Sequence, residues 1–301
     1  MYLYHFGISE LPFTLTPNTS YFFGLPSHNE ALQVLTTALK TGEGFIKVTG
    51  EVGTGKTLLC RKLLNELPAH FATAYIPNPL LSPAELRRAV AHELGVELAL
   101  DCDQQQFTEQ IQQRLIEINQ QHQSAVLLID EAQALPVESI EALRLMTNLE
   151  TESRKLLQVV LFGQPELDEK LDLQQLRQLR QRITFSYALT LMDADQLYQY
   201  VHHRLKIAGF TGTEMFSRDC CSLLFRSSGG TPRIVNVLCH KALMLAYGEG
   251  KQRVEPDHVI AAIKDTEAAR PVYPFASLNV FTGIAIVFLL ILAGYWWMGR
   301  L

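Results

Sequence analysis

Residues 50–57 read GEVGTGKT, and this octapeptide constrains the fold more than any other part of the chain. Its spacing G-x-x-x-x-G-K-[ST] describes a loop whose glycines turn the backbone tightly and bring N–H groups up to phosphate oxygens. In such a loop Lys56 reaches the terminal phosphates, and Thr57 offers its hydroxyl to Mg²⁺ at a helix N-terminus. The run GFIKVTG (44–50) before it is typical of a buried strand, and LLCRKLLNEL (58–67) after it has the leucine spacing of a helix. This order of strand, loop and helix predicts a P-loop rather than a chance glycine-rich turn.

The loop itself is therefore the predicted nucleotide site, with ATP and Mg²⁺ as its ligands. The expected contact residues are Gly50, Glu51, Val52, Gly53, Thr54, Gly55, Lys56, Thr57 and Leu58. GTP is disfavoured because the sequence contains no N-K-x-D guanine-reading motif.

Composition disfavours several other classes of protein. The chain has 301 residues, 48% of them hydrophobic, and a formal net charge of −5, which supplies no general attraction for nucleic acid. Its five cysteines form no C-x-x-C pair. The dipeptide His92-Glu93 does not extend to H-E-x-x-H, because Val96 stands where the second histidine is needed. We therefore expect a folded protein with neither a zinc site nor a disulfide framework.

Apolar runs and helical periods alternate from the P-loop strand onward, which predicts an α/β domain with a doubly wound parallel sheet. The expected strands are 44–50, 72–78, 124–130, 156–163 and 183–191. Past residue 192 the pattern is helical only. We expect a lead-in with the first helix of the ATPase domain at 1–43, the P-loop core at 44–191, a small helical lid domain at 192–269 and a linker at 270–278.

Residues 279–298, NVFTGIAIVFLLILAGYWWM, form an almost unbroken apolar run long enough to cross the hydrocarbon core of a bilayer. Tyr295, Trp296 and Trp297 gather near its end, as interfacial aromatic residues do. A buried core helix is the alternative, and the lack of a polar face over so many turns disfavours it. We predict one transmembrane helix in contact with lipid, a short tail at 299–301, and an ATPase domain in the cytoplasm, where ATP is available.

The third expected strand ends in two carboxylates, in the sequence VLLIDEA (126–132). This edge of a parallel sheet lies beside the mouth of the P-loop. Asp130 suits Mg²⁺ coordination, and Glu131 is the candidate to orient or deprotonate the attacking water. Gln164 follows the next strand, in LFGQPEL (161–167), and is placed to hold that water. The alternatives are a solvated pair of carboxylates and an ordinary loop glutamine.

Two further segments carry arginines of interest. LRQLRQRI (176–183) presents Arg177, Arg180 and Arg182 at the close of a helix, where one of them could reach the nucleotide of a neighbouring subunit as an arginine finger. A solvated basic face is the alternative. In GGTPRIVN (229–236), Arg233 falls in the first turn of an expected helix, where the helix dipole disfavours a cation and a bound phosphate is the expected partner.

Together, GEVGTGKT, LLIDEAQ, FGQPEL, the arginines before ITFSY and the segment GGTPR resemble the motifs of an AAA+ ATPase. The stretches FGISELPFTLTPNTSYFF, HNEAL and IDEAQALPVESIEALRLMTNLET are similar to the general secretion pathway protein A (ExeA-like) family, over residues 1–270. Within that family the chain most resembles members that serve the mannose-sensitive haemagglutinin (MSHA) type IV pilus. The resemblance implies a homo-oligomeric ATP hydrolase, anchored in the inner membrane, that supports assembly of a type IV pilus or a type II secretion machine and has that machine's assembly proteins as partners.

The resemblance also implies a role for each motif residue. It places Lys56 and Thr57 at the phosphates and Mg²⁺, and Asp130 at Mg²⁺. Glu131 is the implied catalytic base, Gln164 the first sensor and Arg233 the second sensor. Arg182, with Arg177 behind it, is the implied arginine finger.

Three functions therefore stand side by side at this point. The first is the assembly ATPase just described. The second is a nucleotide-controlled scaffold whose bound state recruits partners without a motor role. The third is an ATPase of DNA transactions such as transposition, which shares the P-loop and the acidic strand end, and the predicted span and acidic balance argue against it.

Overall fold

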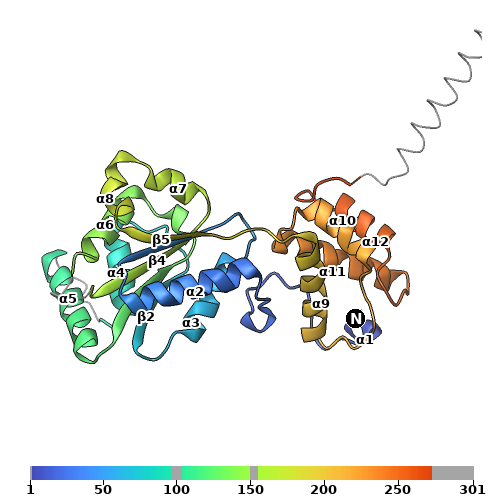
Figure 1. Cartoon of the computed structure of the whole chain (residues 1–301), viewed down its shortest axis with the longest axis horizontal. Coiled ribbons are helices and arrows are strands. Elements are labelled where there is room, and N and C mark those ends of the chain that lie inside the picture. The colour runs from blue at the N-terminus through green and yellow to red at the C-terminus, as the bar shows by residue number, and fades with distance from the viewer. Residues whose placement is uncertain (1, 97–103, 150–154, 273–301) are drawn as a thin grey trace, which may run out of the picture.

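The predicted apolar runs form one parallel sheet in the computed structural model, which describes residues 2–96, 104–149 and 155–272 (Figure 1). The strands are β1 (Phe45–Thr49), β2 (Phe71–Ile76), β3 (Ser124–Ile129), β4 (Leu157–Gly163) and β5 (Ile183–Ala188), in the spatial order β2-β3-β4-β1-β5. Every pair is parallel. All seven residues of β4 are buried, as expected for a central strand covered on both faces. The prediction of a doubly wound α/β sheet is confirmed.

Helices cover both faces of this sheet because successive strand residues point to opposite sides. Ile46 and Val48 pack with the buried stripes of α2 (Pro26–Thr41) and α3 (Lys56–Glu66). Phe45 lies in a second core. That core belongs to the opposite face and includes α4 (Pro83–Glu93), α5 (Gln104–Gln120) and α6 (Val137–Met146). A capping box starts α4, with Ser82 and Glu85 bonded reciprocally.

Short elements connect the later strands. A 3₁₀ turn, η2 (Ala132–Ala134), follows β3, and the segment between β4 and β5 folds into α7 (Glu166–Leu171), η3 (Gln174–Leu176) and α8 (Arg177–Arg180). Since η2 and α7 each begin just after a strand end, they lie at the same edge of the sheet as the P-loop. They are therefore positioned to shape the site.

The helical domain lies to one side of the sheet and is reached by the segment that leaves β5 (Figure 1). It consists of α9 (Ala194–Ile207), α10 (Arg218–Ser228), α11 (Pro232–Gly248) and α12 (Pro256–Lys264). The turn before α11 is tied to this connecting segment, since the Met192 N–H donates to the Gly230 carbonyl over 3.1 Å. A side chain at Gly230, whose φ is +80°, would collide with the Met192 carbonyl. The junction of the two domains thus depends on close backbone contact.

Residues 2–25 pack mainly with the helical domain, whereas the sequence prediction grouped residues 1–43 with the ATPase domain. Helix α1 (Tyr2–Phe6) contacts α11, and η1 (Thr19–Tyr21) contacts α9. Tyr2, Phe6, Phe13 and Tyr21 are buried in the helical core, and only α2 covers the sheet. This segment has no helical or strand period that would reveal such packing, because it contributes single aromatic side chains to a core built by four other helices. Figure 1 shows α1 among those helices, far from the sheet.

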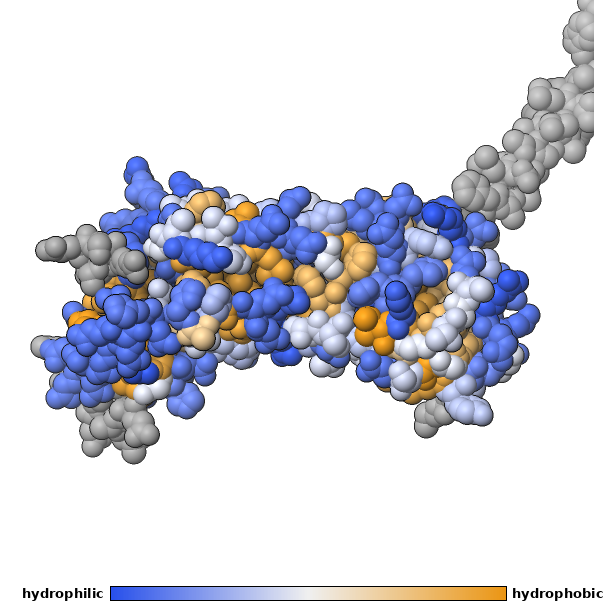
Figure 2. Space-filling model, turned by 60° about the horizontal axis from the view of Figure 1, so that its bottom comes forward, coloured by the Kyte–Doolittle hydropathy of each residue, from blue (hydrophilic) through white to orange (hydrophobic). Residues whose placement is uncertain are grey.

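Hydrophobic residues reach the surface on both domains in the view of Figure 2, with hydrophilic residues between and around them. Within the ranges that the structure describes, no helix has the length and apolar character needed to span a membrane. The predicted span at 279–298, the tail at 299–301 and most of the linker lie outside the described residues.

Candidate nucleotide-binding site

The P-loop has the tight backbone turns that its glycines predict. Gly53 has φ +82° and Gly55 has φ +99°, a region in which residues with a side chain are rare. A Cβ atom at Gly53 would lie 2.7 Å from the Cβ of Arg233, and one at Gly50 would lie 2.9 Å from Oγ1 of Thr54. The glycines therefore allow both the turn and the close approach of the helical domain.

Lys56 begins α3 and is buried, with 5% of its surface exposed. Its Nζ atom donates to the carbonyl oxygens of Gly50, over 2.7 Å, and Glu51, over 2.9 Å. Burial lowers the pKa of the ammonium, and the nearby carboxylates of Glu131 and Asp130 oppose that shift. Both partners of this ammonium are neutral carbonyl oxygens. Phosphate oxygens, which are negatively charged, would make stronger hydrogen bonds with it and could replace them.

Asp130 follows the last residue of β3 and is 2% exposed. It accepts a hydrogen bond of 3.0 Å from the backbone N–H of Glu131, and the hydroxyl of Thr57 is beside it. Burial raises the pKa of this carboxyl group, and the Thr57 hydroxyl and the Glu131 N–H only partly offset the rise. A buried carboxylate next to a threonine hydroxyl is an oxygen donor set that fits Mg²⁺, whose charge would stabilise the ionised acid. The residues present thus suit the cation that the sequence predicts.

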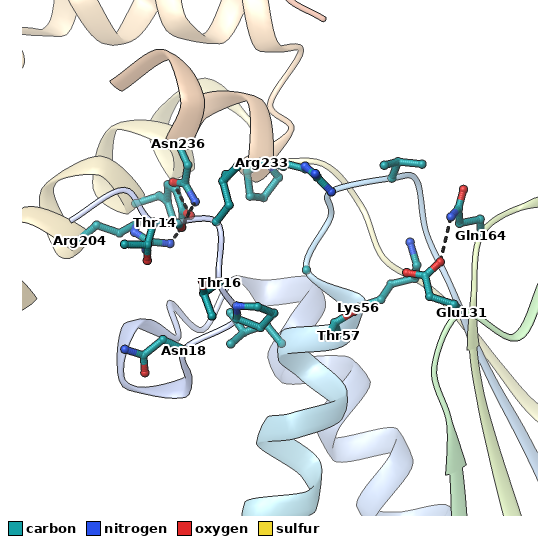
Figure 3. A pocket seen from close by; sticks show the side chains of 18 residues that line it. Thr14, Thr16, Asn18, Lys56, Thr57, Glu131, Gln164, Arg204, Arg233 and Asn236 are labelled. Atoms are coloured by element: carbon teal, nitrogen blue, oxygen red, sulfur yellow. Dashed lines mark hydrogen bonds between the residues drawn. The ribbon is translucent and has the colours of Figure 1, made fainter. Parts of the chain in front are cut away.

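Glu131 is held by two amide groups at the sheet edge. Its backbone is left-handed, with φ +52°, which is uncommon for a residue with a side chain. Its Oε2 atom accepts hydrogen bonds from Nε2 of Gln133, over 2.6 Å, and from Nε2 of Gln164, over 3.0 Å. Figure 3 shows Gln164 and Glu131 facing each other across the end of the cleft that is nearest Lys56. Strain at one residue together with two converging donors is typical of a functional position.

Gln133 completes this cluster and was missed by the sequence analysis. Its Oε1 atom accepts a 3.0 Å bond from the backbone N–H of Gln164, so one amide side chain holds both the carboxylate and the strand end. Lys170 of α7 in turn donates to the carbonyls of Gln133 and Leu135, over 2.6 and 2.7 Å. The position of Gln133, two residues after Glu131 in LLIDEAQ, was the available signal.

The other end of the cleft is lined by the N-terminal segment Thr14–Asn18 and by three side chains of the helical domain. Arg204 is 5% exposed and donates to the carbonyl of Pro12, over 2.5 Å, and to the hydroxyl of Tyr200, over 2.9 Å. That hydroxyl donates to Oδ1 of Asn236 over 2.9 Å. Figure 3 places Arg204, Asn236 and Thr14 together, across the cleft from Lys56 and Glu131. None of these residues was predicted, because they come from distant segments without a motif.

Arg233 lies between the two ends, in the first turn of α11, as predicted. Its backbone N–H approaches the carbonyl of Gly53 at 3.3 Å, so the start of α11 is bonded to the P-loop. Its side chain is drawn over the cleft in Figure 3. Its guanidinium makes no hydrogen bond or ion pair within the described ranges of the chain, and an anionic ligand would be a suitable partner.

Arg177 and Arg182 are not brought into this cleft. They precede β5, whose first residue, Ile183, pairs with Phe45 at the start of β1, whereas the P-loop follows Thr49 at the other end. The two ends of β1 are about 13 Å apart at 3.3 Å per residue. Arg182 contacts the side chain of Asn148. These arginines thus lie at the sheet edge opposite to the nucleotide site of their own chain.

Known proteins are similar to this chain in sequence and in fold. The family model described as an AAA domain matches residues 39–171. General secretion pathway protein A of Aeromonas hydrophila is 38% identical over 297 residues, which are 99% of this chain and 54% of the relative. The chain thus spans about half the length of the curated relative that it matches.

Solved structures with the same fold include two archaeal proteins and a bacterial one. CDC6P of Pyrobaculum aerophilum has a TM-score of 0.66 at 19% identity, and the matched region covers 84% of this chain and 70% of the CDC6P chain. The ORC2 protein of Aeropyrum pernix has a TM-score of 0.63 at 14% identity, over 87% of this chain and 74% of its own. The RuvB branch migration motor of Thermotoga maritima has a TM-score of 0.54 at 17% identity, over 85% of this chain and 73% of its own. At these identities the likeness shows the fold alone.

Proposed function

Because this chain is an AAA+ protein of the general secretion pathway protein A (ExeA-like) family, we infer that it binds MgATP in the described cleft and hydrolyses it. One observation carries this inference: a buried ammonium, a buried carboxylate and a carboxylate held by amide donors converge on one P-loop. ATP hydrolysis needs a cradle for phosphate, a cation and a group that orients water, and this cleft has a candidate for each.

The proposed reaction uses the residues at the sheet edge. Backbone N–H groups of the P-loop and Lys56 bind the β- and γ-phosphates, while Thr57 and Asp130 hold Mg²⁺. The metal would neutralise charge that develops on the phosphate oxygens. Glu131 orients and deprotonates the attacking water, with Gln164 beside it at the γ-phosphate as first sensor.

The nucleoside has a different location in this proposal. It occupies the end of the cleft between the N-terminal segment Thr14–Asn18 and the residues Arg204 and Asn236. Arg233 lies over the phosphates as second sensor, so that the helical domain responds to whether a γ-phosphate is present. Its backbone bond to the P-loop supports this role.

Catalysis is completed between subunits of a homo-oligomer. Arg182, with Arg177 behind it, is the proposed arginine finger, and its position at the opposite sheet edge favours the nucleotide of a neighbouring copy. Arg180 is a weaker candidate because it forms an ion pair with Asp172.

The finer assignment is a membrane-anchored assembly ATPase. Residues 279–298 would anchor the chain in the inner membrane with the ATPase domain in the cytoplasm, and the work of hydrolysis would support assembly of a type IV (MSHA-like) pilus or a type II secretion machine. Support comes from the similarity to general secretion pathway protein A and from the apolar run itself. A scaffold that only needs bound ATP is the competing proposal.

Replacement of Glu131 by glutamine separates the two. The isosteric amide keeps the cleft intact and cannot take a proton, so ATP should stay bound while turnover falls by about 10²- to 10⁴-fold. In cells whose own gene for this protein is deleted, an assembly ATPase with Glu131→Gln should fail to restore pili or secretion, whereas a scaffold locked in its ATP state should restore them. Glu141→Gln, a change in an ion pair with Arg144 on α6, is the control that leaves both readouts intact.

A further inference from the structure

His28 is a buried ionisable residue next to the P-loop that the proposed reaction does not use. It lies in the first turn of α2, at the start of HNEAL, and is 4% exposed. Its Nε2 atom lies 3.0 Å from the carbonyl oxygen of Thr54, and its Nδ1 atom is buried without a hydrogen-bond partner among the described residues. A core position would be filled more favourably by an apolar side chain than by one with an unpaired polar atom. This position therefore calls for an explanation.

The contact fixes which ring nitrogen is the donor. A carbonyl oxygen only accepts hydrogen bonds, so Nε2 carries a proton, and in the neutral imidazole Nδ1 is then the bare nitrogen. Burial lowers the pKa of His28 and thus favours this neutral form, although the bond to Thr54 opposes the shift. The ring serves as a single fixed donor, directed at one backbone atom of the P-loop.

That backbone atom controls the direction of the next N–H group. The peptide between Thr54 and Gly55 is planar and trans, so its carbonyl and its N–H point in opposite directions. When the Thr54 carbonyl is bonded to His28 in the protein interior, the Gly55 N–H is turned the other way, away from His28. Lys56 and Thr57 follow immediately and start α3.

The ring also fits the conformation of Gly55. A Cβ atom at Gly55 would lie 3.0 Å from Nε2 of His28, so the imidazole rests against the Cα of this glycine. Phe22 closes the other side, with its ring centroid 6.0 Å from that of His28 in an edge-on arrangement. The imidazole is thus enclosed between the N-terminal segment and the turn on which α3 begins.

We propose that His28 is a positioning residue for nucleotide binding, which holds the Thr54 carbonyl so that the P-loop keeps its phosphate-binding shape before the nucleotide arrives. This role rests on the proposed binding of MgATP. Removal of the donor would free the peptide to rotate, and binding would then have to restore its direction. The expected loss is therefore in affinity for nucleotide rather than in the chemical step.

Four variants of the full chain in detergent test this role. Glutamine carries an amide nitrogen where histidine has Nε2, whereas asparagine places it where histidine has Nδ1. His28→Gln should bind a fluorescent ATP analogue with Mg²⁺ within about threefold of the wild type, and His28→Asn and His28→Leu should bind it about tenfold more weakly.

Gln158→Leu is the matched control. Gln158 lies on β4, is 2% exposed and has a buried Oε1 without a partner in the described ranges. Its Nε2 donates one 3.2 Å bond to the carbonyl of Leu39, which lies on α2 as His28 does. It repeats the chemistry of His28 about 16 Å further along α2. Its replacement should leave ATP affinity unchanged, and thermal melts of all variants report any general loss of stability.

Two results would overturn the proposal. One is wild-type affinity in both His28→Leu and His28→Asn, and the other is an equal loss of affinity in Gln158→Leu. If His28→Leu does not fold, the difference between His28→Gln and His28→Asn decides. A wild-type chain that does not bind MgATP would instead contradict the proposed function, so the two failures can be told apart.

Discussion

The two ends of the candidate cleft are built in different ways. At the phosphate end, the P-loop, Asp130, Glu131 and Gln164 each come directly after a strand of one sheet. At the other end, the segment Thr14–Asn18 meets side chains of α9 and α11 that come from about 190 to 220 residues further along the chain. Phosphate demands many N–H groups in one geometry, and this demand leaves a readable motif. A nucleoside needs a shaped slot, which many combinations of residues can form.

Replacement of Lys56 by alanine gives the largest expected effect. The ammonium would supply charge-assisted hydrogen bonds to phosphate in a buried site, so its loss should weaken ATP binding by about 10²-fold or more. Inorganic tripolyphosphate, which has no base or ribose, should lose affinity to the same degree. Calorimetric titration of the full chain with each ligand measures both. Equal affinity for ATP in the wild type and the variant would show that the phosphates do not bind at this end of the cleft.

Arg204→Met tests the other end. The change leaves the Pro12 carbonyl and the Tyr200 hydroxyl without their donor, so the stretch that follows Pro12 should be held less firmly against the helical domain. ATP should then bind about tenfold more weakly, whereas tripolyphosphate should bind as before. Because the lost bonds come from a buried cation, the free energy of unfolding should also fall by about 2 kcal/mol.

The control for this variant is Arg218→Met. Arg218 also lies over a tyrosine ring, 4.5 Å from the centroid of Tyr198, but it is exposed and its ion pair with Asp195 is open to solvent. Its loss should change neither affinity nor stability measurably. If Arg204→Met weakened tripolyphosphate as much as ATP, the cleft would have no separate nucleoside end.

The contrast explains what could be read from the sequence. Strand ends next to a P-loop fall at one edge of a parallel sheet, so the proximity of Asp130, Glu131 and Gln164 followed from chain order and apolar runs alone. A helix-start signal, Thr231 followed by Pro232, placed Arg233 in the first turn of a helix, where the structure has it. The contact of α11 with Gly53 could not be predicted from the sequence, because it depends on how the two domains pack against each other.

The residues that sequence analysis missed share a physical property. Gln133, Arg204 and His28 each act through one or two hydrogen bonds, and their backbone partners in Gln164, Pro12 and Thr54 lie 31, 192 and 26 residues away in the sequence. A buried arginine without a carboxylate partner looks like any other charged residue on a helix until Pro12 and the tyrosine rings surround it. Periodicity reports which face of an element is covered, and it says nothing about which distant segment covers it.

Gln133→Ala is expected to have a smaller effect, confined to turnover. The Glu131 carboxylate would lose one of two donors and the Gln164 backbone would lose its acceptor, so the base should be less well oriented. We expect kcat for ATP to fall about tenfold with ATP affinity unchanged. Gln123→Ala, which removes an exposed bond to the Ala69 carbonyl, is the control in the same steady-state assay. A change in affinity without a change in kcat would contradict the role assigned to Gln133.

Asp130→Asn should give the smallest effect, on stability, and it tests whether burial of a carboxyl group at the phosphate end carries an electrostatic cost. Burial raises the pKa of Asp130 above its ordinary value of 3.8, so the folded state favours the protonated acid. The stability that this group contributes is full below the ordinary pKa and is lost as the pH rises through the raised one.

At pH 7 to 8 the asparagine variant without nucleotide should therefore unfold about 2 °C higher than the wild type, and this advantage should shrink toward pH 4. Mg²⁺ with ATP should reverse the order, because only the carboxylate gains from the cation. Thermal melts across pH measure both, and Asp195→Asn, which removes an exposed carboxylate, provides the control. If the melting temperatures of the wild type and Asp130→Asn differed by the same amount at all pH values, the pKa of Asp130 would be no more raised than that of a surface acid. The phosphate end would then carry no electrostatic cost from this carboxyl group.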